Sequence, residues 1–76
     1  MTILLIRASP ETKQQLEVLR ELHDNMNEYE IDFWLTPTAI GHKADMMIRE
    51  EKEEWLKSRL TAEGIPFIIS INDVQQ

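Results

Sequence analysis

Apolar and polar residues alternate along residues 29–35, the most informative stretch of the chain. One alternate set is apolar: Tyr29, Ile31, Phe33 and Leu35. The other set is Glu30, Asp32 and Trp34. This alternation predicts a half-buried strand that turns its odd positions to the core. Trp34 would then point outward beside a carboxylate, which is typical of a surface that contacts a partner.

A short strand over residues 2–7 and a helix are expected before this stretch. Ser9 is a good N-cap, and Pro10 suits the first helical position because its missing N–H is not needed there. Apolar residues at spacings of three and four predict the buried stripe of the helix: Leu16, Leu19, Leu22 and Met26. The helix is expected to stop near residues 25–27.

A loop, a strand, a helix and a last strand are expected after residue 35. Residues 36–42 should form a loop, because Pro37 cannot join a ladder and Gly41 supplies a positive φ. Alternation predicts a strand over residues 43–49. The helix over residues 50–63 has an acidic first turn and stops at Gly64. Its expected buried stripe is Trp55, Leu56 and Leu60, and the last strand covers residues 67–71.

This order of elements predicts an α+β fold, a ferredoxin-like antiparallel open sandwich of βαββαβ topology. Residues 1–76 form one domain, with four strands in one sheet and two helices on one face. On the open face we expect Trp34 and Met47, joined by one alternate set such as Leu4 with Ile6, or by Ile68. An open apolar face is typical of a partner or self-association site, and a merely tolerated apolar face is the alternative.

Composition narrows the classes of partner. The 76 residues carry a net charge of −6, which argues against nucleic acid and against anionic membranes as partners. No apolar run approaches the roughly 20 residues of a membrane span. Without cysteine, the fold must be held by packing alone. Met1 leads directly into a strand pattern, so we expect no signal peptide and expression in the cytoplasm as an isolated segment.

Candidate catalytic groups are few. His23 and His42 lie far apart in sequence, and neither has a neighbouring ligand at metal spacing. The acidic run over residues 50–54 is explained by the positive end of a helix. With two glycines in the chain, a glycine-rich phosphate loop is absent, and an acylphosphatase-type site would have only Arg7. We therefore expect no catalytic residues, no cofactor and no metal site.

Several segments together resemble the activation (pro) domain of pancreatic metallocarboxypeptidases, in particular the A-type and its second pancreatic isoform. The matching residues are Asp32-Phe33-Trp34, Pro37, Gly41, Glu63-Gly64-Ile65 and Asp73-Val74-Gln75. The resemblance implies a non-catalytic prodomain of a secreted zymogen that caps and inhibits a zinc carboxypeptidase. It also implies that Asp32, Trp34, Pro37 and Gly41 belong to the docking edge.

The chain departs from the family pattern in its third strand, which reads Met46-Met47-Ile48-Arg49 in place of Val-Arg-Val-Pro. Helix-forming residues are abundant, and caps, patterns and stops agree along the sequence, as in a designed protein. We therefore expect an engineered, stabilised activation domain that is monomeric and no longer selected to inhibit. The alternative is a small regulatory module of the same fold that binds a ligand or dimerises through the open sheet face.

Overall fold

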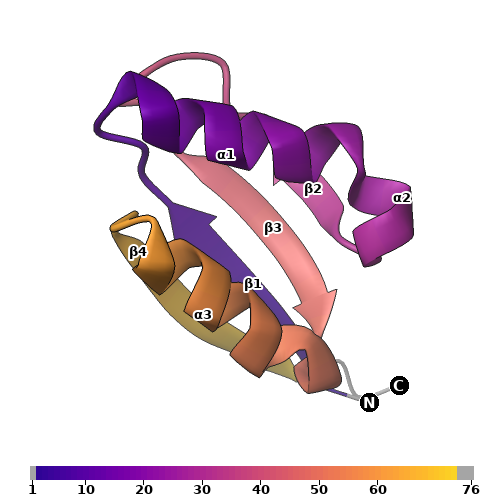
Figure 1. Cartoon of the computed structure of the whole chain (residues 1–76). Coiled ribbons are helices and arrows are strands. Elements are labelled where there is room, and N and C mark those ends of the chain that lie inside the picture. Colours follow the sequence, from indigo (N-terminus) through magenta and orange to yellow (C-terminus); the bar gives the residue numbers. More distant parts are fainter. Residues whose placement is uncertain (1, 74–76) are drawn as a thin grey trace.

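Four antiparallel strands form a single sheet in the computed structural model, which describes residues 2–73 (Figure 1). The strand order across the sheet is β2-β3-β1-β4, so the first strand is central. The arrangement confirms the α+β, ferredoxin-like open sandwich expected from the sequence. The strands are β1 (Thr2–Ala8), β2 (Asp32–Leu35), β3 (Ala44–Arg49) and β4 (Phe67–Asp73).

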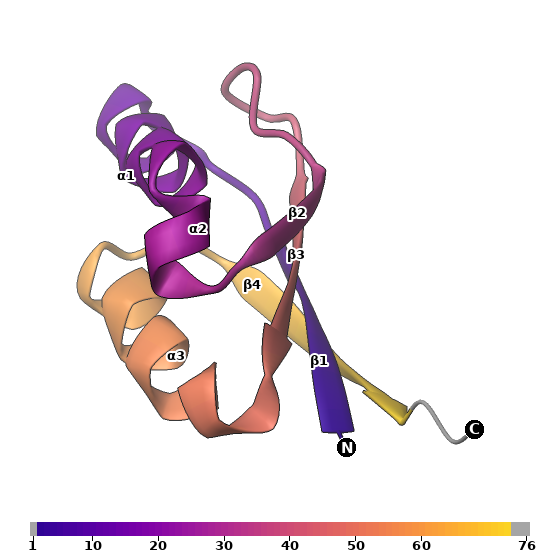
Figure 2. The same ribbon diagram turned by 90° about the vertical axis from the view of Figure 1, so that its right-hand side faces the viewer.

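All helices of residues 2–73 lie on one side of the sheet, and no element of these residues covers the other side (Figure 2). The two long helices are α1 (Lys13–Asp24) and α3 (Glu53–Ala62). The short helix α2 (Met26–Tyr29) follows α1, and the 3-10 turn η1 (Glu50–Lys52) leads into α3. The helix predicted over residues 50–63 is therefore divided into η1 and α3. Strand β4 extends two residues further than predicted. Val74 and Gln75, which contribute to the family resemblance, lie outside the described residues.

The core is built from one alternate set of each central strand. In β1 the even positions Leu4, Ile6 and Ala8 are buried beneath the helices, and they pair with buried residues of β3. The prediction that Leu4 and Ile6 belong to the open face was wrong. Because both faces of β1 are apolar, its sequence pattern could not show which alternate set faces the helices. The buried apolar residues are Leu4, Ile6, Ala8, Leu19, Leu22, Ile31, Ala44, Met46, Ile48, Leu56, Leu60 and Ile65.

Helix α1 begins three residues later than the predicted first position, Pro10. Thr12 is the N-cap, and its hydroxyl oxygen accepts a hydrogen bond from the Gln15 backbone N–H at 3.1 Å. Ser9 is held elsewhere, because its backbone N–H donates to the Pro66 carbonyl at 2.9 Å and so continues the pairing of β1 with β4. Pro10 is buried before the helix starts.

The chain reverses direction before β2, so the second strand is shorter than predicted. Tyr29 is the last residue of α2, and Glu30 takes a left-handed conformation with φ of 61°. The Ile31 backbone N–H donates to the Met26 carbonyl at 2.9 Å, which closes the turn. Ile31 is buried as expected, while Tyr29 packs against the core from the helical layer.

Trp55 is the main correction in the second long helix. Leu56 and Leu60 are buried as predicted, but Trp55 is 37% exposed. Successive helical residues point about 100° apart, so the residue next to Leu56 turns toward the flank. There its ring lies 5.0 Å from that of Tyr29. The prediction of a three-residue buried stripe was therefore wrong at this position.

Side-chain hydrogen bonds tie the two long helices together at both ends. At one end, the Gln15 amide donates to the carbonyl oxygens of Glu63 and Gly64 at 3.2 and 3.0 Å, where α3 has ended. At the other, Glu21 accepts from Arg59 at 3.0 Å and from the Tyr29 hydroxyl at 2.8 Å. The Gln15 bonds satisfy carbonyl oxygens at the C-terminal end of α3, which lack intrahelical partners. The bonds at both ends fix the spacing of the layer above the sheet.

Replacing Gln15 with alanine should destabilise the protein by about 1 kcal/mol, because the carbonyls at the end of α3 lose their donor. Gln14→Ala is the matched control, since Gln14 is exposed one position earlier in the same helix. Urea unfolding of both variants measures the difference. Equal free energies of unfolding for the two variants would show that the Gln15 bonds add nothing.

Candidate interaction surface

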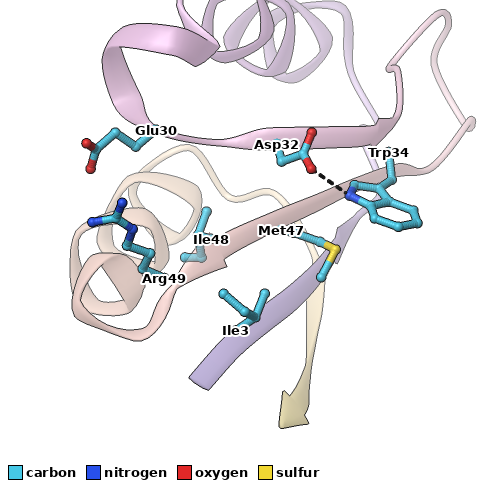
Figure 3. A pocket seen from close by; sticks show the side chains of 7 residues that line it. All are labelled: Ile3, Glu30, Asp32, Trp34, Met47, Ile48 and Arg49. Carbon is cyan, nitrogen blue, oxygen red and sulfur yellow. Dashed lines mark hydrogen bonds between the residues drawn. The ribbon is translucent and has the colours of Figure 1, made fainter. Parts of the chain in front are cut away.

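Trp34 stands on the open face of the sheet, as the alternation predicted. Its side chain is 69% exposed, the most exposed of the large apolar residues in the described part of the chain. The indole N–H donates to the Asp32 carboxylate at 2.9 Å, as the dashed line in Figure 3 shows. This bond holds the indole in one orientation on the open face.

An irregularity in β2 produces the exposure of this region. Phe33 pairs with Met46 on the helix-covered face, and the register then shifts before Leu35 pairs with Asp45. Leu35 therefore shares the open face and is 47% exposed, contrary to the prediction that it faces the core. A bulge that places an extra residue in one strand commonly redirects a side chain in this way.

Trp34 lines two neighbouring hollows. The first has a volume of about 280 Å³ and the second about 690 Å³. The first lies over the sheet, and Asp32 and Met47 contribute to it (Figure 3). The second lies against the loop after β2, where Gly41 and His42 contribute. The indole is thus a ridge with a concave surface on each side, the shape expected of an anchor residue.

Pro37 and Gly41 have different roles in the loop between β2 and β3. Gly41 is exposed, has φ of 88°, and its backbone N–H donates to the Pro10 carbonyl at 2.9 Å. An added Cβ there would meet no atom within 4 Å, so the glycine is needed for its backbone conformation. Pro37 is buried and lines a hollow beside Arg20 and His23 of α1. The structure therefore brings Asp32, Trp34 and Gly41 to the surface and packs Pro37 inside.

An ion pair crosses the middle of the open face. The Arg7 guanidinium donates twice to the Asp45 carboxylate, at 2.7 and 3.0 Å. These bonds hold the pKa of Asp45 below its usual value. Sequence analysis missed this pair, and it also missed Ile3 and Leu5 as open-face residues. Only the register of β1 against β3 reveals which alternate set faces outward.

Within residues 2–73 no three histidine, cysteine or acidic side chains are grouped so that they could hold a metal ion. None of the helices described is both long enough and apolar enough to cross a membrane.

The prediction that Ile68 belongs to the open face is confirmed, since it pairs with Arg7 and is 67% exposed. The open face therefore presents apolar groups around one ion pair.

Comparisons with known proteins agree with the resemblance. The family model for the carboxypeptidase activation peptide matches residues 6–76. Carboxypeptidase A1 of Sus scrofa is 31% identical over 71 residues, which are 93% of this chain and 17% of that protein. The crystal structure of thrombin activatable fibrinolysis inhibitor (TAFI) has a TM-score of 0.80 at 21% identity, over 96% of this chain and 18% of that chain. At that identity, the structural likeness concerns the fold alone.

The Arg7–Asp45 pair should make stability depend on pH. Asp45 has a lower pKa in the folded protein than in the unfolded chain, where it is about 3.9. Its contribution is therefore complete above the unfolded value and lost as the pH falls through the folded value. Asp45→Asn should be less stable than the parent near neutral pH and should lose less stability on acidification to about pH 2.

Urea unfolding at both pH values measures this effect, with Arg7→Met as the second variant. Arg7→Met keeps the carboxylate but removes its partner, so it should flatten the pH profile to a similar extent. A profile for either variant that parallels the parent would contradict the assignment.

Proposed function

Because the chain belongs to the carboxypeptidase activation peptide family, we propose that it is a non-catalytic prodomain that caps a zinc carboxypeptidase. In this role it folds on its own, covers the entrance to the active site and keeps substrate out. The zinc ion belongs to the partner enzyme. The observation that carries the proposal is Trp34, held outward by Asp32 on the bare side of the sheet.

The docking edge in this proposal consists of Asp32, Trp34, Pro37 and Gly41. Exposed tryptophans in pre-organised positions commonly supply a large part of the binding energy of an interface. Gly41 and Pro37 contribute through the loop, Gly41 by its backbone conformation and Pro37 by packing against α1. The two hollows beside the indole would accept side chains from the rim of the enzyme cleft.

The chain spans 17% of the length of Carboxypeptidase A1, its curated relative. Activation peptides of this family are parts of secreted zymogens, so the corresponding natural setting is a protein exported together with its protease. In the proposal, the enzyme supplies all of the chemistry. The prodomain supplies a shape that fits the cleft and a rigid scaffold beneath it.

We propose further that the chain is a stabilised redesign of such a domain. Buried polar side-chain atoms all have hydrogen-bond partners within the described residues, and the α1 cap, the Gln15 bonds and the Glu21 cluster reinforce one another. Agreement among local signals of this kind is what a designer aims for. In this proposal stability was selected and inhibition was not, so inhibition needs its own test.

Titration of the isolated chain into an active A-type zinc carboxypeptidase should lower the peptidase rate. Trp34→Ala should raise the inhibition constant by about 30-fold or more, the effect of losing a hot spot worth about 2 kcal/mol. Trp55→Ala is the matched control, because it removes the other tryptophan from the helical side of the molecule.

If the parent chain inhibits and both alanine variants weaken inhibition equally, Trp34 does not belong to the docking edge. No loss of rate at micromolar concentrations of the parent chain would remove the inhibitor role from this chain. Family membership would be unaffected, because it does not depend on this rate.

The redesign proposal predicts unusual thermal stability for a domain of this length without a disulfide. The melting midpoint should lie above the band of about 45–65 °C that is usual for mesophilic domains. Circular dichroism during heating measures it. A midpoint inside that band would contradict the redesign proposal.

A further inference from the structure

The two edges of the sheet differ in their ability to accept another strand. The edge strand β2 has four residues and an irregular register, and buried Pro37 follows it closely. The opposite edge strand, β4, has seven residues and pairs with β1 regularly along its whole length. Its other side pairs with no strand in the described part of the chain. Unprotected edges of this length and regularity are templates for strand addition.

The phase of the ladder shows which backbone groups point to this free side. The Ser9 backbone N–H donates to the Pro66 carbonyl, so these two residues form a hydrogen-bonded pair. Hydrogen-bonded and non-hydrogen-bonded pairs alternate along an antiparallel ladder. Residues 68, 70 and 72 therefore direct their N–H and C=O groups toward β1. Residues 67, 69, 71 and 73 direct theirs away from the sheet.

The sequence of β4 offers little protection against strand addition. It reads Phe-Ile-Ile-Ser-Ile-Asn-Asp, with a single charged residue, Asp73, at its end. Proteins commonly protect edges with lysine, proline or a bulge, and none of these occurs within β4. Ile68 adds a side chain that is 67% exposed. The edge is thus regular in register, largely uncharged and apolar.

We propose that the β4 edge pairs antiparallel with the β4 edge of a second copy of this chain. A two-fold axis at Ser70 brings all seven residues of each strand into register, with 69 opposite 71 and 67 opposite 73. These opposed residues are the ones whose N–H and C=O groups point away from the sheet. They can therefore form hydrogen bonds with the second copy in this register. Ser70 lies opposite its own copy as a non-hydrogen-bonded pair with Cα atoms about 4.5 Å apart.

The flank of α3 above this edge is compatible with the same symmetry. Leu56 and Leu60 face the sheet, and Arg59 reaches toward α1. Helical spacing places Glu53 and Lys57 on the flank of α3 opposite Arg59. The helix itself lies over the edge strand β4 (Figure 1). Glu53 and Lys57 pair with each other at 3.8 Å. The flank thus presents both signs of charge to its own copy, so the two-fold axis does not confront like charges alone.

Pairing at this edge leaves the Trp34 face free, because that residue lies on the far edge strand β2. The two sheets would become one continuous sheet with both open faces on the same side. The inference therefore goes beyond the prodomain role and does not compete with it. The chain carries a net charge of −6, so repulsion between copies should weaken the pairing at low ionic strength.

The chain has no cysteine, so a single introduced cysteine can form a disulfide only with its copy in a second molecule. Such variants test the two-fold axis directly. Ser70→Cys should form an intermolecular disulfide under mild oxidation, because the expected Cα separation lies within the range that a disulfide spans. Ser58→Cys, at an exposed position on α3, is the matched control and should cross-link far more slowly. Equal rates for the two variants would overturn the proposed axis.

Charged residues at the same position test the monomer–dimer equilibrium. Sedimentation measures it at protein concentrations up to about 1 mM, where weak interfaces are populated. The parent chain should dimerise more at high salt. Ser70→Lys and Ser70→Asp should each be monomeric, and their mixture should recover the dimer. Circular dichroism checks that each variant is folded.

Met47→Lys separates this interface from association through the open face. It should leave the dimer intact, because Met47 lies on β3, away from the β4 edge. A parent chain that remains monomeric throughout, a mixture that does not recover the dimer, or loss of the dimer in Met47→Lys alone would each overturn the proposal.

Discussion

One-sided covering of the sheet is the constraint on which the rest of this structure depends. A chain of 76 residues without cysteine has only enough helix to cover one face, so the core lies entirely between that face and the helices. Successive strand residues point to opposite faces. Once Leu4 and Ile6 are buried, Ile3, Leu5 and Arg7 must face outward. The exposed apolar face is thus the unavoidable counterpart of the core.

The bulge in β2 modifies this rule at one place. Without the register shift, strict alternation from Phe33 would return Leu35 to the core. The shift instead leaves Trp34 and Leu35 both exposed, and the bond to Asp32 holds the indole in place. A feature that costs one ladder position therefore adds Leu35 to the exposed surface beside the indole. Bulges are frequent beside functional sites for this reason.

The sequence predicted the element order, the topology and the outward position of Trp34, because period-two and helical patterns report directly on exposure. It failed where two signals competed. Ser9 is a good cap by type, but pairing with Pro66 held its backbone in the sheet. Both faces of β1 are apolar, so only its pairing with neighbouring strands shows which face is buried. The Arg7–Asp45 pair joins residues 38 positions apart, and no local pattern could connect them.

Strand order also has a consequence for how the molecule is made. β1 precedes the other described elements along the chain, yet it lies in the middle of the sheet, and its two neighbours are β3 and β4. Its partners along one side are residues 67–73, about 60 or more positions further along the chain. On the ribosome one side of this apolar strand must therefore stay unpaired until residues 67–73 have emerged. Folding dominated by such distant contacts is slow, and chaperone binding to β1 would shield this strand meanwhile.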